Sequence, residues 1–258
     1  MITARSLLQN AILLLTRNPK KTVTVVAPAL VLMLGVGILT ALLAPDVLAA
    51  NANTSDFSFL ADGPVPLLLV AGFVLSYALM AILWHRHTLA DRPARRPMSA
   101  MLVMGYLWRV LALALIQLVA SLAIIMPLLI VTETGDGAAR PPALVSILIT
   151  TFTTQIILLW FSLRLSLILP AAALGKPMPL AHSWRHTDTI ARPLWGVAAA
   201  LALVNTGFTA ITTFIQPTAP SYAVAVELPI HIIEGLLIFS VLTTLYSILV
   251  QKDGSSAA

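Results

Sequence analysis

Apolar residues in this chain gather into six long runs that alternate with short polar gaps. Each run has about 20 residues, the length that an α-helix needs to cross roughly 30 Å of hydrocarbon. Backbone amides inside such a layer find no water, so each run is predicted to be a helix, and the chain an all-α membrane bundle. We expect one transmembrane domain over residues 1–258. The predicted spans are approximately 22–43, 64–84, 108–131, 143–163, 194–215 and 229–250.

Residues 2–17, before the first span, have the pattern of an amphipathic helix. Leu7 and Ala11 fall on one side, and Gln9 and Asn10 on the other. A short helix with a basic polar face is expected to lie in the membrane interface rather than to span it. The same pattern is found at 179–191 and, more weakly, at 97–108.

These three segments allow two interpretations. Each would precede a two-span hairpin, and the second and third units open with Arg-Pro-Met at 96–98 and Lys-Pro-Met at 176–178. The chain is therefore either three repeats of a helix hairpin, or a bundle whose hairpins share basic and aromatic anchors for membrane reasons alone.

Fourteen of the fifteen basic residues lie on one side of the predicted spans, and only Arg140 lies on the other. Basic side chains near span ends are retained in the cytoplasm. Both termini are thus predicted to be cytoplasmic, in a multi-pass protein of a bacterial inner membrane.

Composition supports a membrane setting. Hydrophobic residues make up 59% of the chain and charged residues 10%, too few charges for a water-exposed surface. The net charge of +5 lies at membrane edges, which favours anionic lipids over nucleic acid as the partner, at roughly 1 kcal/mol per basic residue. Arg164 is expected to snorkel to the inner face, and the apolar stretch 165–174 to continue its helix or to break at Pro170. The candidate headgroup contacts are Arg17, Lys20, Lys21, Arg86, Arg95, Arg96, Arg164 and Arg185.

Two groups of polar residues are candidates for chemistry. His231 and Glu234 share a helix face in the last span, where an acid costs up to a few kcal/mol unless it is neutralised or paired. They would serve either a proton or cation pathway or helix packing. His182 and His186 have the i, i+4 spacing of zinc ligands, although neighbouring arginines disfavour a cation.

Three short segments carry a resemblance to a known group. The segments Trp-His-Arg-His-Thr-Leu-Ala-Asp at 84–91 and Met-Gly-Tyr-Leu-Trp-Arg-Val-Leu at 104–111 resemble uncharacterised alphaproteobacterial inner-membrane proteins, as does the stretch 164–175. Those proteins are similar to the membrane region of some glycerophosphodiester phosphodiesterases. The resemblance implies a six-helix bundle and no reaction, because the catalytic barrel of those enzymes is a separate domain.

No catalytic signature stands out in the sequence. Phosphate-binding glycine loops, nucleophile elbows and zincin motifs are absent from it, and no cofactor is expected. The function predicted here is that of a non-catalytic accessory or scaffold protein, in contact with lipids and other integral membrane proteins. The alternative is a transporter of small solutes or lipids that uses Glu234 and His231.

Overall fold

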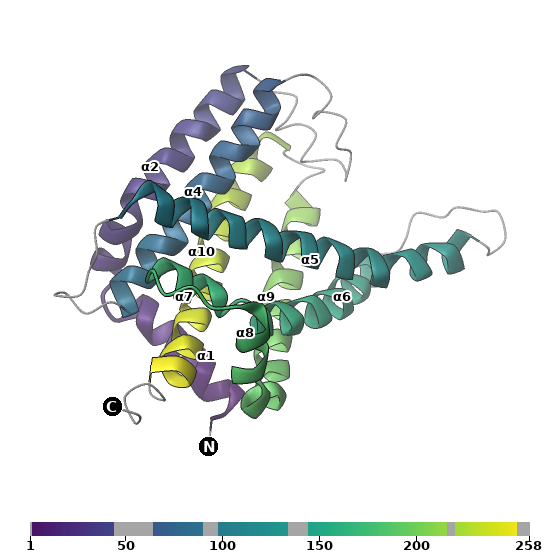
Figure 1. Cartoon of the computed structure of the whole chain (residues 1–258). Helices are drawn as coiled ribbons and strands as arrows, with labels where there is room; N and C mark the ends of the chain where they lie inside the picture. The colour runs from purple at the N-terminus through teal and green to yellow at the C-terminus, as the bar shows by residue number, and fades with distance from the viewer. Residues whose placement is uncertain (1, 44–63, 90–97, 134–143, 216–219, 252–258) are drawn as a thin grey trace.

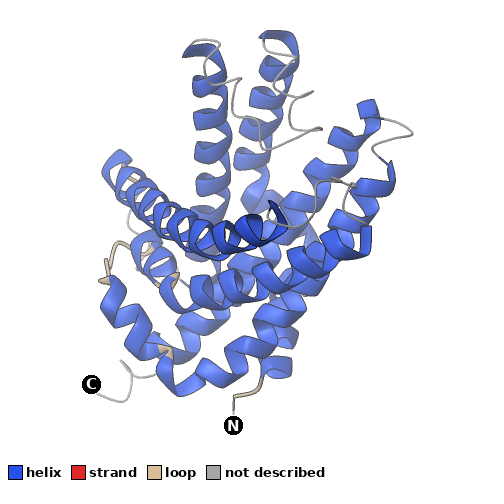
Figure 2. Cartoon of the chain, turned by 90° about the vertical axis from the view of Figure 1, so that its right-hand side faces the viewer, coloured by secondary structure: helices blue, strands red, loops and turns tan. Residues whose placement is uncertain are grey.

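The structure, a computed structural model, describes residues 2–43, 64–89, 98–133, 144–215 and 220–251, which are helical with no strand (Figure 2). The long helices are α2 (Pro19–Leu43), α4 (Pro64–Leu89), α5 (Ala100–Glu133), α6 (Leu144–Leu165), α9 (Ala191–Ile215) and α10 (Pro220–Tyr246). The shorter elements are α1 (Ala4–Thr16), α7 (Ile168–Ala173), α8 (Leu180–His186), the 3₁₀ turn η3 (Asp188–Ile190) and the π-helical turn η4 (Ser247–Gln251).

The six predicted spans are confirmed as helices. The described residues contain six helices that are long and apolar enough to cross a membrane, one for each apolar run. The chain is therefore a multi-pass membrane protein of the all-α class.

Two of the predicted interfacial helices differ in the structure. Nothing interrupts the helix between Ala100 and Trp108, so the described part of segment 97–108 is the first part of α5 rather than a separate helix. Segment 179–191 is divided, because α8 ends at His186 and η3 follows it. The hydroxyl of Thr187 folds back onto the carbonyl of Ser183 at this break.

The helices pack around α10, which contacts α1, α4, α7 and α9. The most extensive pairings are α2 with α4 and α6 with α9. Figure 1 shows α5 crossing α2 and α4 at a steep angle, with α1 and α8 at the end of the molecule where both termini lie. The pairing of α6 with α9 joins the second predicted hairpin to the third, and the three-repeat interpretation stays a prediction.

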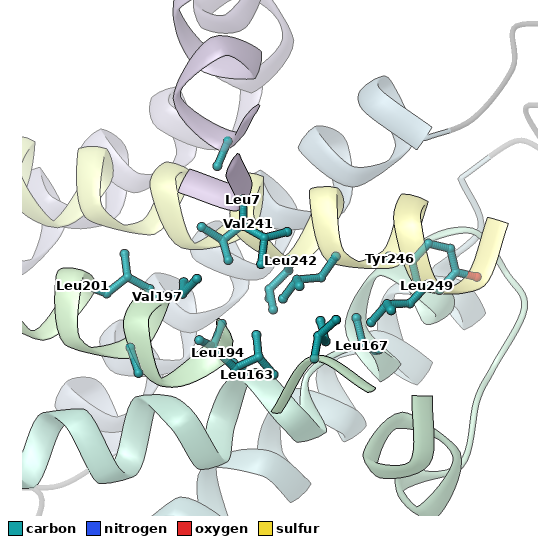
Figure 3. Close-up of a cluster of buried hydrophobic side chains, with 14 of the residues drawn as sticks. Leu7, Leu163, Leu167, Leu194, Val197, Leu201, Val241, Leu242, Tyr246 and Leu249 are labelled. Carbon is teal, nitrogen blue, oxygen red and sulfur yellow. The ribbon is translucent and has the colours of Figure 1, made fainter. Parts of the chain in front are cut away.

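Helix α1 is fastened to the bundle by a cap and by its apolar face. Thr3 and Ser6 form a reciprocal capping box at its N-terminus, which satisfies backbone amides that the first turn leaves free. Leu7 and Ala11 are buried, and α1 packs on α9 and α10. Figure 3 shows Leu7 beside Val241 in the core cluster that also holds side chains of α6, α7 and α9. The predicted amphipathic helix is thus present, with its apolar face turned to the protein.

The segment after α6 is a short buried turn of chain. Pro170 has no amide hydrogen to bond the carbonyl of Ser166, which instead accepts from Leu169 N at 3.0 Å. The helix therefore breaks a turn before Pro170, at Ser166, so neither of the two expected alternatives, an unbroken helix or a break at Pro170, is observed. Leu167 and Ala171 are fully buried, so the segment belongs to the core rather than to the interface.

Candidate functional site

His231 and Glu234 lie about one helical turn apart on α10, and the structure brings them together with Asn205 of α9. His231 Nδ1 is 3.7 Å from Glu234 Oε2, and Asn205 Nδ2 donates a hydrogen bond of 2.9 Å to Glu234 Oε1. The Glu234 side chain is 16% exposed, whereas that of His231 is 65% exposed. Glu234 is thus enclosed between two helices with a polar partner on each, the pairing that an intramembrane acid requires.

Beside Glu234, α10 makes a close approach to α4. A Cβ atom added to Gly235 would overlap the hydroxyl and ring of Tyr77, a residue of α4. Glycine therefore allows the Tyr77 hydroxyl to rest directly against the α10 backbone. The ring of Tyr77 also meets Phe239 of α10 edge-on, with centroids 5.3 Å apart. This contact fixes the register of α4 against α10 at the level of Glu234.

A cavity of about 780 Å³ lies next to this contact, bounded by α2, α4, α5, α7 and α10. Ligand pockets in proteins span roughly 300–1,000 Å³, so the cavity has the size of a binding site. The apolar lining residues are Met33, Leu69, Val70, Phe73, Val74, Ala78, Ala81, Val110, Leu169, Leu228, Ile232 and Phe239. Polar side chains in the lining are those of Thr40, Tyr77, Tyr106 and His231. Such a wall suits a hydrocarbon chain and offers few groups to hydrate an ion.

Arg164 is placed differently from the sequence expectation. It is 5% exposed, and its guanidinium contacts Asp188, the Thr187 hydroxyl and the Trp184 carbonyl. The guanidinium carbon also lies 3.6 Å from the centroid of the Trp184 ring and 5.3 Å from that of Trp160. Arg164 therefore does not snorkel, because its own chain supplies the acceptors and the aromatic faces that a headgroup region would offer.

The other candidate headgroup residues divide by position. Arg17, Lys20, Lys21 and Arg185 are exposed and Arg86 is half-buried. Arg95 and Arg96 lie outside the described residues. Arg17 and Lys21 come together in one pocket between α1, α2 and α4. Sequence reasoning named these two residues, but not the pocket.

The histidines do not converge on a metal. His182 and His186 are neighbours, with ring centroids 5.4 Å apart, as their spacing predicted. His85 instead lies in the core, where its Nδ1 is 2.9 Å from the hydroxyl of Thr243. Among the described residues no group of three histidine, cysteine or acidic side chains is arranged to hold an ion.

Several contacts of the site carry no signal in the sequence. Asn205 ties α9 to α10 through its bond to Glu234, and its position in the sequence does not identify that partner. Tyr77 and Gly235 were not singled out, and neither was Trp84, whose indole N–H is buried. A glycine directly after an intramembrane acid was the one available hint of a close helix approach.

Comparison with known proteins finds no match for this chain among protein-family models, curated proteins or solved structures. The resemblance to the membrane region of glycerophosphodiester phosphodiesterases therefore stays a prediction. The functional argument rests on the geometry of the described residues.

Proposed function

We propose that this chain is a non-catalytic protein of a bacterial inner membrane that holds a lipid chain in its apolar cavity. It would act as an accessory or scaffold component beside other integral membrane proteins, with both termini in the cytoplasm. The observation that carries the proposal is the cavity of about 780 Å³, whose wall comes from five helices and is mainly apolar. A mainly apolar cavity of this size suits a hydrocarbon occupant.

The unburied surface of α5 supports the scaffold role. Met101, Met104, Trp108 and Leu115 are each more than half exposed, and Tyr106 is the buried side chain among the described residues of this helix. In a membrane this helix presents its apolar side chains to lipid or to a partner helix. α5 contacts α4, α6 and α7 on one side, and a helix that leaves its other apolar side uncovered fits an accessory role better than a closed channel does.

A cavity-filling substitution tests the proposal. Val74 lines the cavity and is 47% exposed, so tryptophan fits there with its ring in the cavity. Val31 of α2 is 70% exposed and is not in the lining, which makes Val31→Trp the matched control. Native mass spectrometry in mild detergent should find lipid retained by the wild type and by Val31→Trp, and lost from Val74→Trp. Equal retention by both variants, or a wild-type chain with neither lipid nor protein partner, contradicts the proposal.

The predicted orientation has a separate test. Reporter tags fused to each end, assayed for cytoplasmic or periplasmic activity, should both report the cytoplasm. A periplasmic signal from either end removes the assignment of sides without affecting the cavity.

A second candidate function is transport with Glu234 and His231 as coupling groups. It is favoured by one observation, that His231 lines the cavity and lies 3.7 Å from Glu234. Glu234→Gln keeps the shape of the side chain and the contact with Asn205, and removes the charge. Under transport, flux of a solute or lipid in reconstituted vesicles should lose its dependence on pH in this variant. An unchanged flux profile counts against transport and leaves the lipid-holding role in place.

A further inference from the structure

A second, polar pocket lies where α1 ends, α2 begins and α4 ends. Its volume is about 350 Å³. The lining residues are Leu14, Arg17, Asn18, Lys21, Thr22, Trp84, His87 and Thr88. Two carry permanent positive charges, and none of these lining residues is acidic. Both charges come from the junction of α1 and α2, and α4, distant in the sequence, supplies another part of the wall.

The donors around this pocket outnumber the acceptors. Asn18 accepts a bond of 3.3 Å from Lys21 N through its Oδ1, which leaves the amide NH₂ as a donor. Arg17 and Lys21 bring further donors on exposed side chains. A site composed in this way is suited to an anion with several acceptor oxygens.

Trp84 lines this pocket and carries an unsatisfied donor. The residue is 1% exposed, and its indole Nε1 has no hydrogen-bond partner among the described residues. Buried donors are nearly always satisfied in folded proteins, because an unpaired buried N–H is unfavourable. Because Nε1 itself is buried, the indole has to turn towards the pocket before it can donate to an acceptor bound there.

Two threonine hydroxyls of the pocket wall bond helix carbonyls. The Thr22 hydroxyl donates to the Leu15 carbonyl of α1 at 3.2 Å, and the Thr88 hydroxyl donates to the Trp84 carbonyl of α4 at 2.8 Å. Leu15 lies in the last turn of α1, so the first bond engages one carbonyl of a negative helix end that would repel an anion. Two full positive charges then dominate the pocket.

We propose that this pocket binds a phosphate group, either the phosphate of a membrane phospholipid or that of a water-soluble phosphate ester. Phosphate offers several acceptor oxygens to the guanidinium of Arg17, the ammonium of Lys21, the amide of Asn18 and the indole of Trp84. The pocket shares no lining residue with the apolar cavity, so the proposal extends the proposed lipid contact to a defined second site.

The test measures binding of three probes to the full chain in mild detergent, by native mass spectrometry. Dioleoylphosphatidate carries the phosphate and the chains, dioleoylglycerol only the chains, and glycerol 3-phosphate only the phosphate. The double variant Arg17→Gln/Lys21→Gln should weaken the phosphatidate by about tenfold or more, since it removes two charge-assisted bonds. Trp84→Phe keeps the aromatic packing, lacks the N–H and should weaken it by about threefold. Far-UV circular dichroism and size exclusion establish that each variant is folded.

The matched control is Arg5→Gln/Lys20→Gln, which removes the same charge from the same two helices outside the pocket. It should bind the phosphatidate as the wild type does. Competition by glycerol 3-phosphate assigns the site to soluble phosphates, and its failure assigns the site to lipid headgroups. Equal binding of phosphatidate and dioleoylglycerol, equal losses in the two double variants, or unchanged binding by Trp84→Phe would overturn the proposal. If Val74→Trp loses the lipid of the apolar cavity but still binds phosphatidate more tightly than dioleoylglycerol, the phosphate site is separate from the cavity of the proposed function.

Discussion

Replacement of Gly235 by alanine tests the closest contact between two spans. The added methyl group would overlap the hydroxyl and ring of Tyr77, so the tyrosine must move away from α10. Tyr77 also packs against Phe239, one turn further along α10, whose ring lies 5.3 Å away. The displacement therefore disturbs the α4–α10 contact beside Glu234 rather than a single flexible side chain.

The magnitude follows from two opposing effects. Alanine in a helix interior is favoured over glycine by about 0.5–1 kcal/mol, and forcing extra volume into a packed contact costs about 1–3 kcal/mol. The net expectation is a destabilisation of about 0.5–2 kcal/mol, or a fall in Tm of about 1–8 °C for a chain of this size. Gly207 of α9 has nothing within 4 Å of its added Cβ, so Gly207→Ala should be neutral or stabilising.

Thermal unfolding in detergent, followed by tryptophan fluorescence, compares the two alanine variants. A double-mutant cycle adds Tyr77→Leu, which removes the clashing ring. In the Tyr77→Leu background, Gly235→Ala should no longer lower the stability, which corresponds to a coupling energy of about 1–2 kcal/mol. If Gly235→Ala and Gly207→Ala shift Tm alike, or if the cycle shows no coupling, the close approach is not what selects glycine here.

Two further substitutions test the packing. Arg164→Lys keeps the charge but loses the guanidinium that bonds Thr187 and stacks on Trp184, so it should lower the free energy of unfolding by about 2–3 kcal/mol. The control is Arg185→Lys, at an exposed residue of α8, and equal stability of the two variants would contradict the buried role of Arg164. Thr3→Ala removes the capping box of α1 and should destabilise this helix by about 1 kcal/mol. Amide hydrogen exchange should then become faster in residues 4–16 only, and exchange rates unchanged from wild type would show that the cap is dispensable.

The sequence predicts the membrane spans but not how they pack against one another. An apolar run of about 20 residues has one stable state in hydrocarbon, so the six helices follow from composition alone. Which helices pair depends on side-chain shape, and α6 pairs most extensively with α9, from a different predicted hairpin, rather than with α5. Both expected alternatives, an unbroken helix and a break at Pro170, missed the break at Ser166, because a proline deprives the carbonyl four residues earlier of its partner, here that of Ser166.

The site was predictable only where its members share one helix. His231 and Glu234 are adjacent on α10 because three residues make nearly one turn, and no partner need be known. Arg164 was expected at the lipid surface because its acceptors, on α8 and η3, lie about twenty residues further along the chain. A carboxylate and two indole rings of the same chain contact the Arg164 guanidinium in place of a lipid headgroup. No residue close to position 164 in the sequence indicates these contacts.

One face of α4 connects the two proposed sites. Tyr77 and Ala81 line the apolar cavity, and Trp84 and Thr88 line the polar pocket. These positions recur at intervals of three or four residues, so they form one stripe along the helix. The change from apolar to basic surroundings falls between Ala81 and Trp84, a rise of about 4.5 Å at 1.5 Å per residue. A bilayer passes from hydrocarbon to phosphate in the same order, and α4 thus presents a matching gradient to an amphiphile along a single face.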